Sequence, residues 1–405
     1  MGTSEAAPVL PPEDAPPGRW GALRVLAAAC FLGMTCWFSA SAVLPQLRSE
    51  WSLSSTAGAL LTVSVQLGFV VGSLCSAFLN VADLIPPRRL MLWGALASAA
   101  ANGLLLAVSR PEPAILLRFL TGAALAFVYP PGLKAIATWF RKERGTALGA
   151  MVGSLTLGSA FPHLLNGLGG AQWRWVIGTT SVLTLVGGLL AEFGGRDGPF
   201  PFPRARFDPL QASRAFANPG VRLACLGYFG HQWELYAVWS WFAAFFADVL
   251  LRAGDPMPQR GAAFATFAVI GVGAWGCWFA GRVGDRWGRA RIAALALTIS
   301  GACCLAAPLP GLPPWAVLGI GLVWGFWVVA DSAQFSTIVT EVGDQSYIGT
   351  AVTMQLAIGF VLTAVTIWLA PLLRDGLGWQ AAFGCLAVGP ALGVAAMLRL
   401  QRRLA

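Results

Sequence analysis

Among the ionisable side chains within the long apolar stretches of this chain, five are best placed to do chemistry. They are Arg118, His163, His231, Glu234 and Asp331, and the two histidines are the only ones among the 405 residues. A charged group in hydrocarbon is costly unless it is paired, so such residues commonly mark ion pathways, proton relays or ligand sites. We therefore take these five side chains as candidate functional residues.

Two of the carboxylates have aromatic neighbours at helical spacing. At about 100° per residue, one helix stripe contains His231, Glu234, Val238, Trp241 and Phe245, and another contains Trp324, Trp327, Asp331 and Gln334. A carboxylate beside an imidazole can take up and release a proton near neutral pH. A carboxylate ringed by aromatic residues instead suits an organic cation, through charge and cation–π attraction. A third interpretation is a hydrogen-bonded pair that only holds helices together.

The two candidates in the first half of the chain are a cation and a histidine. The first apolar stretch contains no acid that could pair with Arg118. This leaves helix carbonyls or a substrate anion as its partner. His163 follows Pro162 and precedes Asn166 in a single apolar stretch. For both residues, a functional and a purely structural role remain open.

Long apolar stretches supply the elements that must position these residues. The chain is 57% hydrophobic and 11% charged, whereas soluble proteins carry roughly 25% charged residues. A stretch of about 20 residues crosses the hydrocarbon core of a bilayer as a helix, which bonds its own backbone polar groups. We predict an all-α integral membrane protein with twelve spans, at 20–46, 55–80, 89–109, 113–139, 145–168, 173–194, 222–251, 260–281, 290–309, 313–339, 348–372 and 379–398.

The net charge of +9 could suggest a nucleic-acid partner, but the positions of the charges indicate membrane topology. With the N-terminus inside, 19 of the 27 Lys and Arg residues fall on the inner side and six on the outer side. This asymmetry follows the positive-inside rule. It predicts that both termini are cytoplasmic, in the inner membrane of a bacterium. All eight cysteines fall in apolar stretches without metal-site spacing, so we expect no metal and no other cofactor.

The chain consists of two similar halves. A Pro- and Arg-rich interval predicts a cytoplasmic linker at 195–221, between six-helix bundles at 20–194 and 222–402, after a tail at 1–19. Asp83 and Asp285 follow the second apolar stretch of their halves and are 202 residues apart. Gly145 and Gly349 begin the fifth apolar stretch and are 204 residues apart. Landmarks in the same order at nearly one separation indicate an internal repeat.

A loop between two apolar stretches carries the most specific motif. The segment Gly281-Arg282-Val283-Gly284-Asp285-Arg286-Trp287-Gly288-Arg289 resembles the signature loop of the major facilitator superfamily of transporters. The resemblance implies a gating loop in which glycine permits close helix approach and the acid caps or pairs with a neighbouring helix end in one conformation. The residues that carry it are Gly281, Asp285, Arg286, Gly288 and Arg289, with a partial counterpart in Asp83, Arg88 and Arg89.

The resemblance implies a secondary active transporter with twelve helices in two pseudo-symmetric bundles, which move against each other around a central substrate site. We expect a small-molecule substrate, a proton as coupling ion, and a monomer in the lipid bilayer. In this family an Arg-x-x-x-Gly element, here Arg118 to Gly122, is linked to proton transfer. The substrate remains open between a small organic anion attracted by Arg118 and an amphiphilic organic cation attracted by Glu234 and Asp331.

Other functions are a multidrug or metabolite efflux antiporter and a non-transporting sensor of the same fold. The chain contains no glycine-rich nucleotide loop with lysine and no catalytic constellation, so we predict neither an ATP-driven pump nor an enzyme. The predicted substrate and coupling site comprises Glu234, His231, Asp331, Arg118, Gln334, Trp241, Trp327 and His163.

Overall fold

The computed structural model describes residues 16–169, 172–200, 209–344 and 348–404, apart from the side chains of residues 82, 83 and 209. Within these ranges every regular element is a helix, as expected for a chain whose backbone polar groups must bond within their own segment in lipid. Most of the predicted N-terminal tail, and residues 201–208 of the predicted linker, lie outside the described ranges.

The N-terminal bundle contains the first six spans. Its helices are α1 (Arg19–Gly33), η1 (Met34–Cys36), α2 (Ser39–Ala42), α3 (Leu44–Trp51), α4 (Ser55–Phe78), α5 (Val81–Leu84), α6 (Pro87–Gly103), η2 (Leu104–Ala107), α7 (Pro111–Leu125), α8 (Tyr129–Ala137), α9 (Arg144–Leu168) and α10 (Trp173–Gly194).

The C-terminal bundle follows two short connecting helices, η3 (Pro209–Gln211) and α11 (Ala212–Ala217). Its helices are α12 (Pro219–Arg252), α13 (Pro258–Trp287), α14 (Arg289–Ala306), α15 (Pro314–Val328), α16 (Ser332–Val342), α17 (Ile348–Leu377), α18 (Trp379–Leu386) and α19 (Val388–Leu404).

The first span is built differently from the others. Eleven segments of the described chain form helices long and apolar enough to cross a membrane. The first helix, α1, has only 15 residues, and the chain then continues through η1, α2 and α3. Together with this broken segment, the structure has the twelve spans that the sequence predicts.

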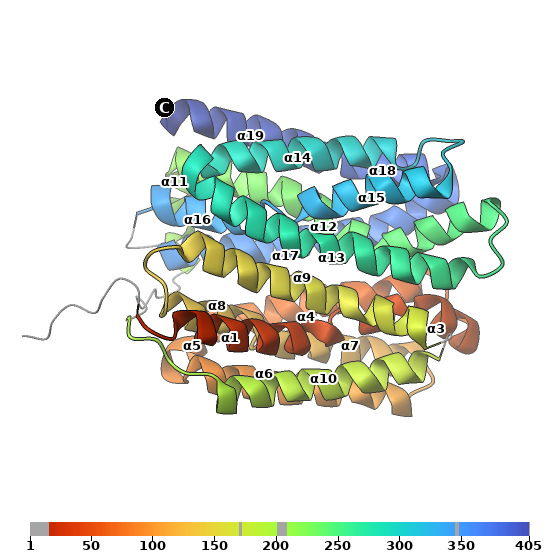
Figure 1. Ribbon diagram of the computed structural model, residues 1–405, viewed down its shortest axis with the longest axis horizontal. Helices are drawn as coiled ribbons and strands as arrows, with labels where there is room; N and C mark the ends of the chain where they lie inside the picture. Colours follow the sequence, from red (N-terminus) through yellow and green to blue (C-terminus); the bar gives the residue numbers. More distant parts are fainter. Residues whose placement is uncertain (1–15, 170–171, 201–208, 345–347, 405) are drawn as a thin grey trace, which may run out of the picture.

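Two pairs of long helices join the bundles. Helix α9 of the N-terminal bundle packs along α13, and α4 packs along α17. Figure 1 shows α9 and α13 side by side through the middle of the molecule, with α1 beginning and α19 ending on the same side. This arrangement agrees with an even number of spans and leaves the contact between bundles to a few helices.

The internal repeat is visible in corresponding helix breaks. Helices α7 and α8 are separated by residues 126–128, and α15 and α16 by residues 329–331, which lie 203 positions later. Near each break a glycine brings two backbones together. A Cβ on Gly122 would lie 2.0 Å from the carbonyl oxygen of Val65, and one on Gly325 would lie 1.7 Å from that of Val269. Any side chain there would force the helices apart.

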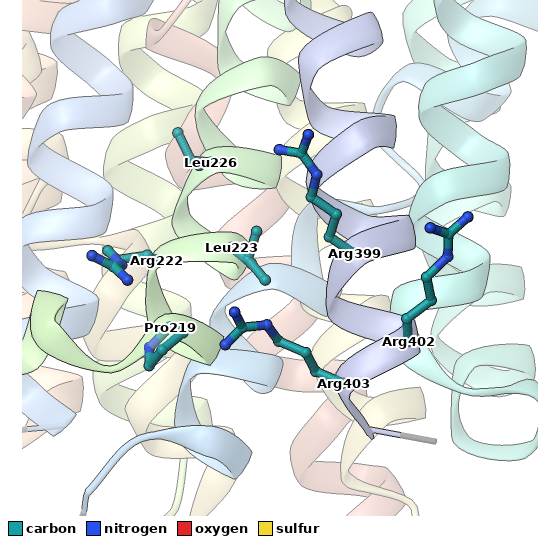
Figure 2. A pocket seen from close by; sticks show the side chains of 7 residues that line it. All are labelled: Pro219, Arg222, Leu223, Leu226, Arg399, Arg402 and Arg403. Carbon is teal, nitrogen blue, oxygen red and sulfur yellow. The ribbon is translucent and has the colours of Figure 1, made fainter.

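A pocket opens at the surface where the beginning of α12 meets the end of α19. It has a volume of about 450 Å³ and is lined by Pro219, Arg222, Leu223, Leu226, Arg399, Arg402 and Arg403 (Figure 2). It lies on the side of the molecule where the described chain begins and ends.

Candidate functional site

His231 and Asp331 form a buried pair at the break between α15 and α16. Nδ1 of His231 lies 2.8 Å from Oδ1 of Asp331, and the side chains are 2% and 1% exposed. On the far side of the ring, Nε2 lies 2.9 Å from the hydroxyl of Ser332. Because imidazole can both accept and donate through its two nitrogens, this arrangement can hold a proton next to a carboxylate and release it again.

Glu234 occupies a separate buried site one helical turn along α12. Its carboxylate accepts hydrogen bonds from Ser300 Oγ at 2.9 Å, Cys304 Sγ at 3.1 Å and Trp324 Nε1 at 2.5 Å. These donors lie on α14 and α15, so the carboxylate points into the C-terminal bundle. The single stripe that His231 and Glu234 share in the sequence therefore becomes two sites with different partners.

Arg118 on α7 is completely buried and is bound by protein acceptors. Its Nη1 donates to the carbonyl oxygen of Cys36 at 3.0 Å, to Ser39 Oγ at 3.1 Å and to Asn102 Oδ1 at 2.9 Å, and its Nη2 donates to the carbonyl oxygen of Trp37. Two of the acceptors are carbonyls in the irregular part of the first span, between α1 and α2. Of the two kinds of partner that the sequence leaves open, the structure supplies helix carbonyls.

The remaining predicted site residues are distributed over several helices. Trp241 Nε1 donates to the carbonyl oxygen of Ile367 on α17 at 3.0 Å. Trp327 packs edge-on against Phe279, with ring centroids 6.0 Å apart. His163 on α9 is 1% exposed, and neither of its ring nitrogens has a hydrogen-bond partner among the described residues. The two tryptophans therefore join helices, whereas both nitrogens of His163 are available to another group.

Gln334 shares a sequence stripe with Asp331, but its side chain reaches the gating loop. Its Nε2 donates to the carbonyl oxygen of Ala280 at 3.1 Å, and its Oε1 accepts from Arg289 Nη1 at 3.3 Å. Gln334 thus ties α16 to the end of α13 and to the start of α14. It connects the helix that begins after Asp331 with the gating loop.

Asp285, at the end of α13, connects the gating loop to the other bundle. Its Oδ1 lies 2.7 Å from Arg289 Nη2, and Nε of the same arginine lies 2.7 Å from Glu341 Oε1. Across the interface, a Cβ on Gly145 would lie 2.8 Å from Asp285 Oδ2. Gly145 is the second residue of α9, and a carboxylate at a helix start interacts favourably with the helix dipole.

The contact continues along α9 and α13 through glycines at four-residue spacing, which we call the glycine seam: Gly145, Gly149 and Gly153. A Cβ on Gly149 would lie 2.8 Å from the carbonyl oxygen of Cys277, and one on Gly281 would lie 2.7 Å from that of Gly145. Small residues at this spacing let helix backbones approach closely in a membrane. The seam closes the space between the bundles beside the gating loop.

The other residues predicted to form gating loops differ between the two halves. In the second loop Arg286 is exposed, and Gly288 turns the chain with φ +94°. In the first loop Arg88 Nε lies 3.2 Å from Asp197 Oδ1, and Arg89 Nε lies 3.7 Å from Glu192 Oε1. Both of these acids belong to the N-terminal half, at or just after the end of α10. The side chain of Asp83, in α5, lies outside the described part of the structure.

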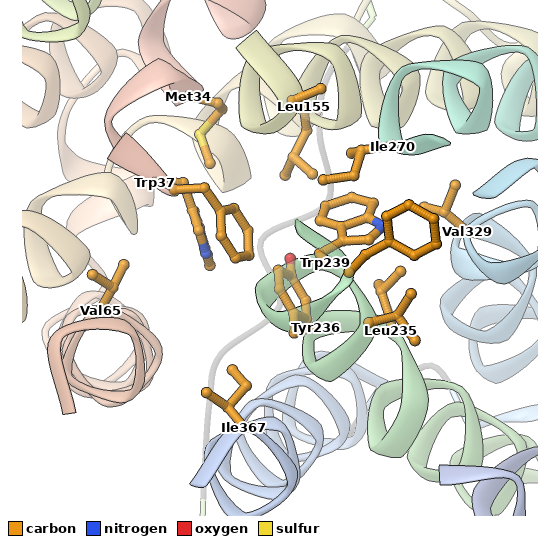
Figure 3. Packing of buried hydrophobic residues seen from close by; sticks show 14 of the residues in the cluster. Met34, Trp37, Val65, Leu155, Leu235, Tyr236, Trp239, Ile270, Val329 and Ile367 are labelled. Carbon is orange, nitrogen blue, oxygen red and sulfur yellow. The ribbon is translucent and has the colours of Figure 1, made fainter. Parts of the chain in front are cut away.

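Six buried rings meet between the bundles and form what we call the aromatic junction: Trp37, Phe38, Phe69, Tyr236, Trp239 and Phe360. Tyr236 stacks on Trp37 with ring centroids 5.7 Å apart, and Phe69 lies 4.7 Å from Phe360. Figure 3 shows Trp37 on one side of this junction and Tyr236 and Trp239 of α12 on the other. The indole nitrogens of Trp37 and Trp239 have no hydrogen-bond partner among the described residues.

Sequence reasoning missed several residues that complete these sites. Asn102 bridges Arg118 to the first span, and Ser300 and Cys304 bind Glu234. Asn102 could have been found as an amide in an otherwise apolar span. Ser300 and Cys304 give no such signal, because small polar residues are common where membrane helices pack.

Comparison with known proteins identifies the family. The model of the Major Facilitator Superfamily matches residues 26–354. The MFS transporter asaE of Aspergillus flavus is 22% identical over 228 residues, which cover 55% of this chain and 50% of that protein. A probable actinorhodin transporter of Streptomyces coelicolor is 28% identical over 165 residues, which cover 39% of this chain and 28% of the relative. The chain therefore spans half or less of the length of these curated relatives.

A solved structure shows the same fold over nearly the whole chain. It is the crystal structure of a bacterial homologue of the human lysosomal transporter Spinster, in an inward-facing and unoccupied conformation. The two structures agree with a TM-score of 0.66 at 17% sequence identity, and the match covers 95% of each chain.

Proposed function

Because the chain belongs to the major facilitator superfamily and has the fold of a membrane transporter rather than that of an enzyme, we propose that it is a secondary active transporter that exchanges protons for an amphiphilic organic cation. The observation that carries this proposal is the buried pair of His231 and Asp331 at the break between α15 and α16. Ionisable residues within membrane spans typically serve ion or substrate pathways.

The pair offers a simple means of coupling. Asp331 can be neutralised either by a proton shared with His231 or by a cationic solute, and the two compete for one carboxylate. A solute that binds one protonation state better than the other shifts the balance between conformations by that difference in affinity. Exchange of proton and solute at Asp331 would then drive the bundles between their two openings around a fixed site.

The aromatic junction supports an organic substrate. Its rings lie between the bundles, where the family places solutes near the middle of the membrane, and aromatic faces attract organic cations. Several buried polar groups lack hydrogen-bond partners among the described residues: the indole nitrogens of Trp37 and Trp239, the amide of Gln66 and the imidazole of His163. A bound solute could pair with these groups, since buried polar groups are normally satisfied.

The contacts of Arg118 and Glu234 disfavour both residues as the binding site. Arg118 already donates to four protein acceptors through Nη1 and Nη2, two of them backbone carbonyls, and only its Nε lacks a partner among the described residues. Glu234 already accepts three hydrogen bonds within its own bundle. We therefore assign Arg118 and Glu234 to holding the helices together, and prefer a cation to a small organic anion as substrate.

For the topology, we propose the orientation indicated by the basic residues, with the gating loops and both termini in the cytoplasm of a bacterium. On this assignment the glycine seam and Asp285 close the path on the cytoplasmic side. The 19 Lys and Arg residues counted on that side support this orientation.

The test is proton movement in liposomes that contain the purified protein and an internal pH-sensitive dye. Adding ethidium outside should drive protons out of liposomes that contain the wild-type protein, which the internal dye reports as a rise in pH. Asp331→Asn should reduce this signal to that of protein-free liposomes. Glu112→Gln, which removes an exposed carboxylate at the start of α7, should respond like the wild type. A wild-type response from Asp331→Asn would overturn the coupling role of Asp331. A response of the wild type to gluconate but not to ethidium would overturn the proposal that the substrate is a cation.

A further inference from the structure

We propose that the pocket between the beginning of α12 and the end of α19 binds the headgroup of an anionic phospholipid. Four arginines line it: Arg222 of α12, and Arg399, Arg402 and Arg403 of α19. The pocket lies outside the path between the bundles, so a ligand there would be neither substrate nor coupling ion. Its assignment does not depend on the proposed transport of a cation.

Among the described residues, the four guanidinium groups have no acidic partner. No Asp or Glu lines the pocket, and none of the four forms an ion pair among the described residues. Other arginines on the same side of the molecule do have acids: Arg19 lies 2.7 Å from Glu143, and Arg88 lies 3.2 Å from Asp197. Arg24 and Arg286 also form no ion pair among the described residues and are exposed. What distinguishes the pocket is therefore the grouping of four arginines from two helices along one lining.

The four arginines are grouped, as binding of a phosphate group requires. Arginines that only set the membrane topology would be scattered over the surface. The pocket arginines come from helices about 180 residues apart in sequence. In Figure 2 Arg399 and Arg403 reach from α19 toward α12, and Arg222 lies on the other side of α12 in this view. A guanidinium can hold phosphate oxygens with two parallel hydrogen bonds. Several of them can thus bind one phosphate, or two phosphates on one headgroup.

Apolar residues next to the arginines indicate a lipid rather than a free phosphate. Leu223 and Leu226 line the same pocket, farther along α12 into the membrane. Leu226 is 52% exposed, and it offers a surface for an acyl chain. Basic pockets between spans at the cytoplasmic surface are typical sites for anionic headgroups, and on our topology this pocket faces that leaflet.

The proposal is tested by native mass spectrometry of the purified full-length protein, titrated with cardiolipin, phosphatidylglycerol and phosphatidylcholine. We expect both anionic lipids to bind more tightly than phosphatidylcholine, and cardiolipin most tightly. The double variant Arg222→Gln/Arg399→Gln should weaken cardiolipin binding by roughly five-fold for each charge removed, because a basic residue near a charged membrane surface contributes about 1 kcal/mol.

The matched control is Arg24→Gln/Arg196→Gln, which removes two exposed arginines from the same side of the N-terminal bundle. It should leave cardiolipin binding within about two-fold of the wild type, because these residues lie outside the pocket. Equal weakening by both double variants would show that the surface charge alone attracts lipid. Unchanged binding in the pocket variant, or full competition by inorganic pyrophosphate, would also overturn the lipid site. Variants that elute from size exclusion as the wild type does confirm that folding is intact.

Discussion

Arg118 in the N-terminal bundle and Asp331 in the C-terminal bundle are held in opposite ways. In the N-terminal bundle Arg118 makes hydrogen bonds to four acceptors, including two carbonyls of the broken first span. In the C-terminal bundle Asp331 contacts one titratable side chain, His231, and lies where α15 gives way to α16. A side chain whose partners are all fixed is suited to holding helices, whereas a pair with few partners can exchange one of them.

The corresponding helix breaks sharpen this difference. Residues 126–128 and 329–331 occupy equivalent places in the repeat. The first break contains Ala126, Phe127 and Val128, whereas the second ends in Asp331. The break itself is therefore part of the shared scaffold, and the carboxylate is a feature that only one half has acquired.

The largest effect on stability should come from Arg118→Ala. It removes the donor from two backbone carbonyls, Ser39 and Asn102, which then remain buried without it. We expect a loss of about 3–5 kcal/mol, the range for breaking a buried charged network. Thermal unfolding in detergent measures the change, with the exposed Arg110→Ala as control. A loss no larger than that of Arg110→Ala would remove the contrast between the bundles.

Asp331→Asn should show the reverse behaviour, with transport lost and the fold retained. Asparagine has nearly the same shape as aspartate and carries no charge, and its amide can still contact the imidazole ring of His231. We expect the stability to change by only about 1 kcal/mol, as for one hydrogen bond. Chemical unfolding and the liposome assay, done on the same preparation, measure the two properties. A loss of stability as large as that of Arg118→Ala would make the pair structural.

Disturbing a contact between the bundles should cost less stability than removing Arg118, which holds helices within one bundle. In Gly149→Ala the new methyl group would lie 2.8 Å from the carbonyl oxygen of Cys277. We expect a loss of about 1–3 kcal/mol, typical of overpacking. The matched change Gly319→Ala meets nothing within 4 Å, and it should be neutral or stabilise α15 by up to about 1 kcal/mol. Equal melting temperatures for the two variants would show that the seam is not tightly packed.

Asp285→Asn should have the smallest effect. Asp285 is 35% exposed in its pair with Arg289, so solvent screens the interaction, and we expect about 0.3–1 kcal/mol at low salt. The shift in unfolding midpoint should shrink as salt is added, because ions screen exposed charges. A larger shift that is independent of salt would mean that Asp285 anchors the bundles as firmly as Arg118 anchors the first span.

Much of the fold could be predicted from the sequence, because lipid imposes simple rules on length and polarity. The predicted spans at 145–168 and 173–194 differ by at most one residue from α9 (Arg144–Leu168) and α10 (Trp173–Gly194). The irregular part of the first span could not be predicted, because it contains no proline between α1 and α2. It is stabilised by Arg118, which lies about 80 residues away in the chain.

The candidate site was less predictable, because helical spacing fixes a face but not the partner. His231 and Glu234 lie on one stripe, yet their side chains reach different helices. Asp331 and Trp324 share another stripe, yet Asp331 contacts His231 and Trp324 contacts Glu234. Which neighbour a side chain meets depends on the tilt and rotation of whole helices, and these are set by packing against other helices.

The glycine seam also has a consequence for the speed of opening. It consists of separate contacts of small residues, with backbone at Gly149 and Gly153 and with the Asp285 carboxylate at Gly145. Lipid tails can replace such contacts as the helices part, since there is little hydrophobic drive holding apolar helices together in a bilayer. The seam can therefore part in successive small steps. For the proposed transport cycle, we expect this to keep the activation barrier between the two openings low.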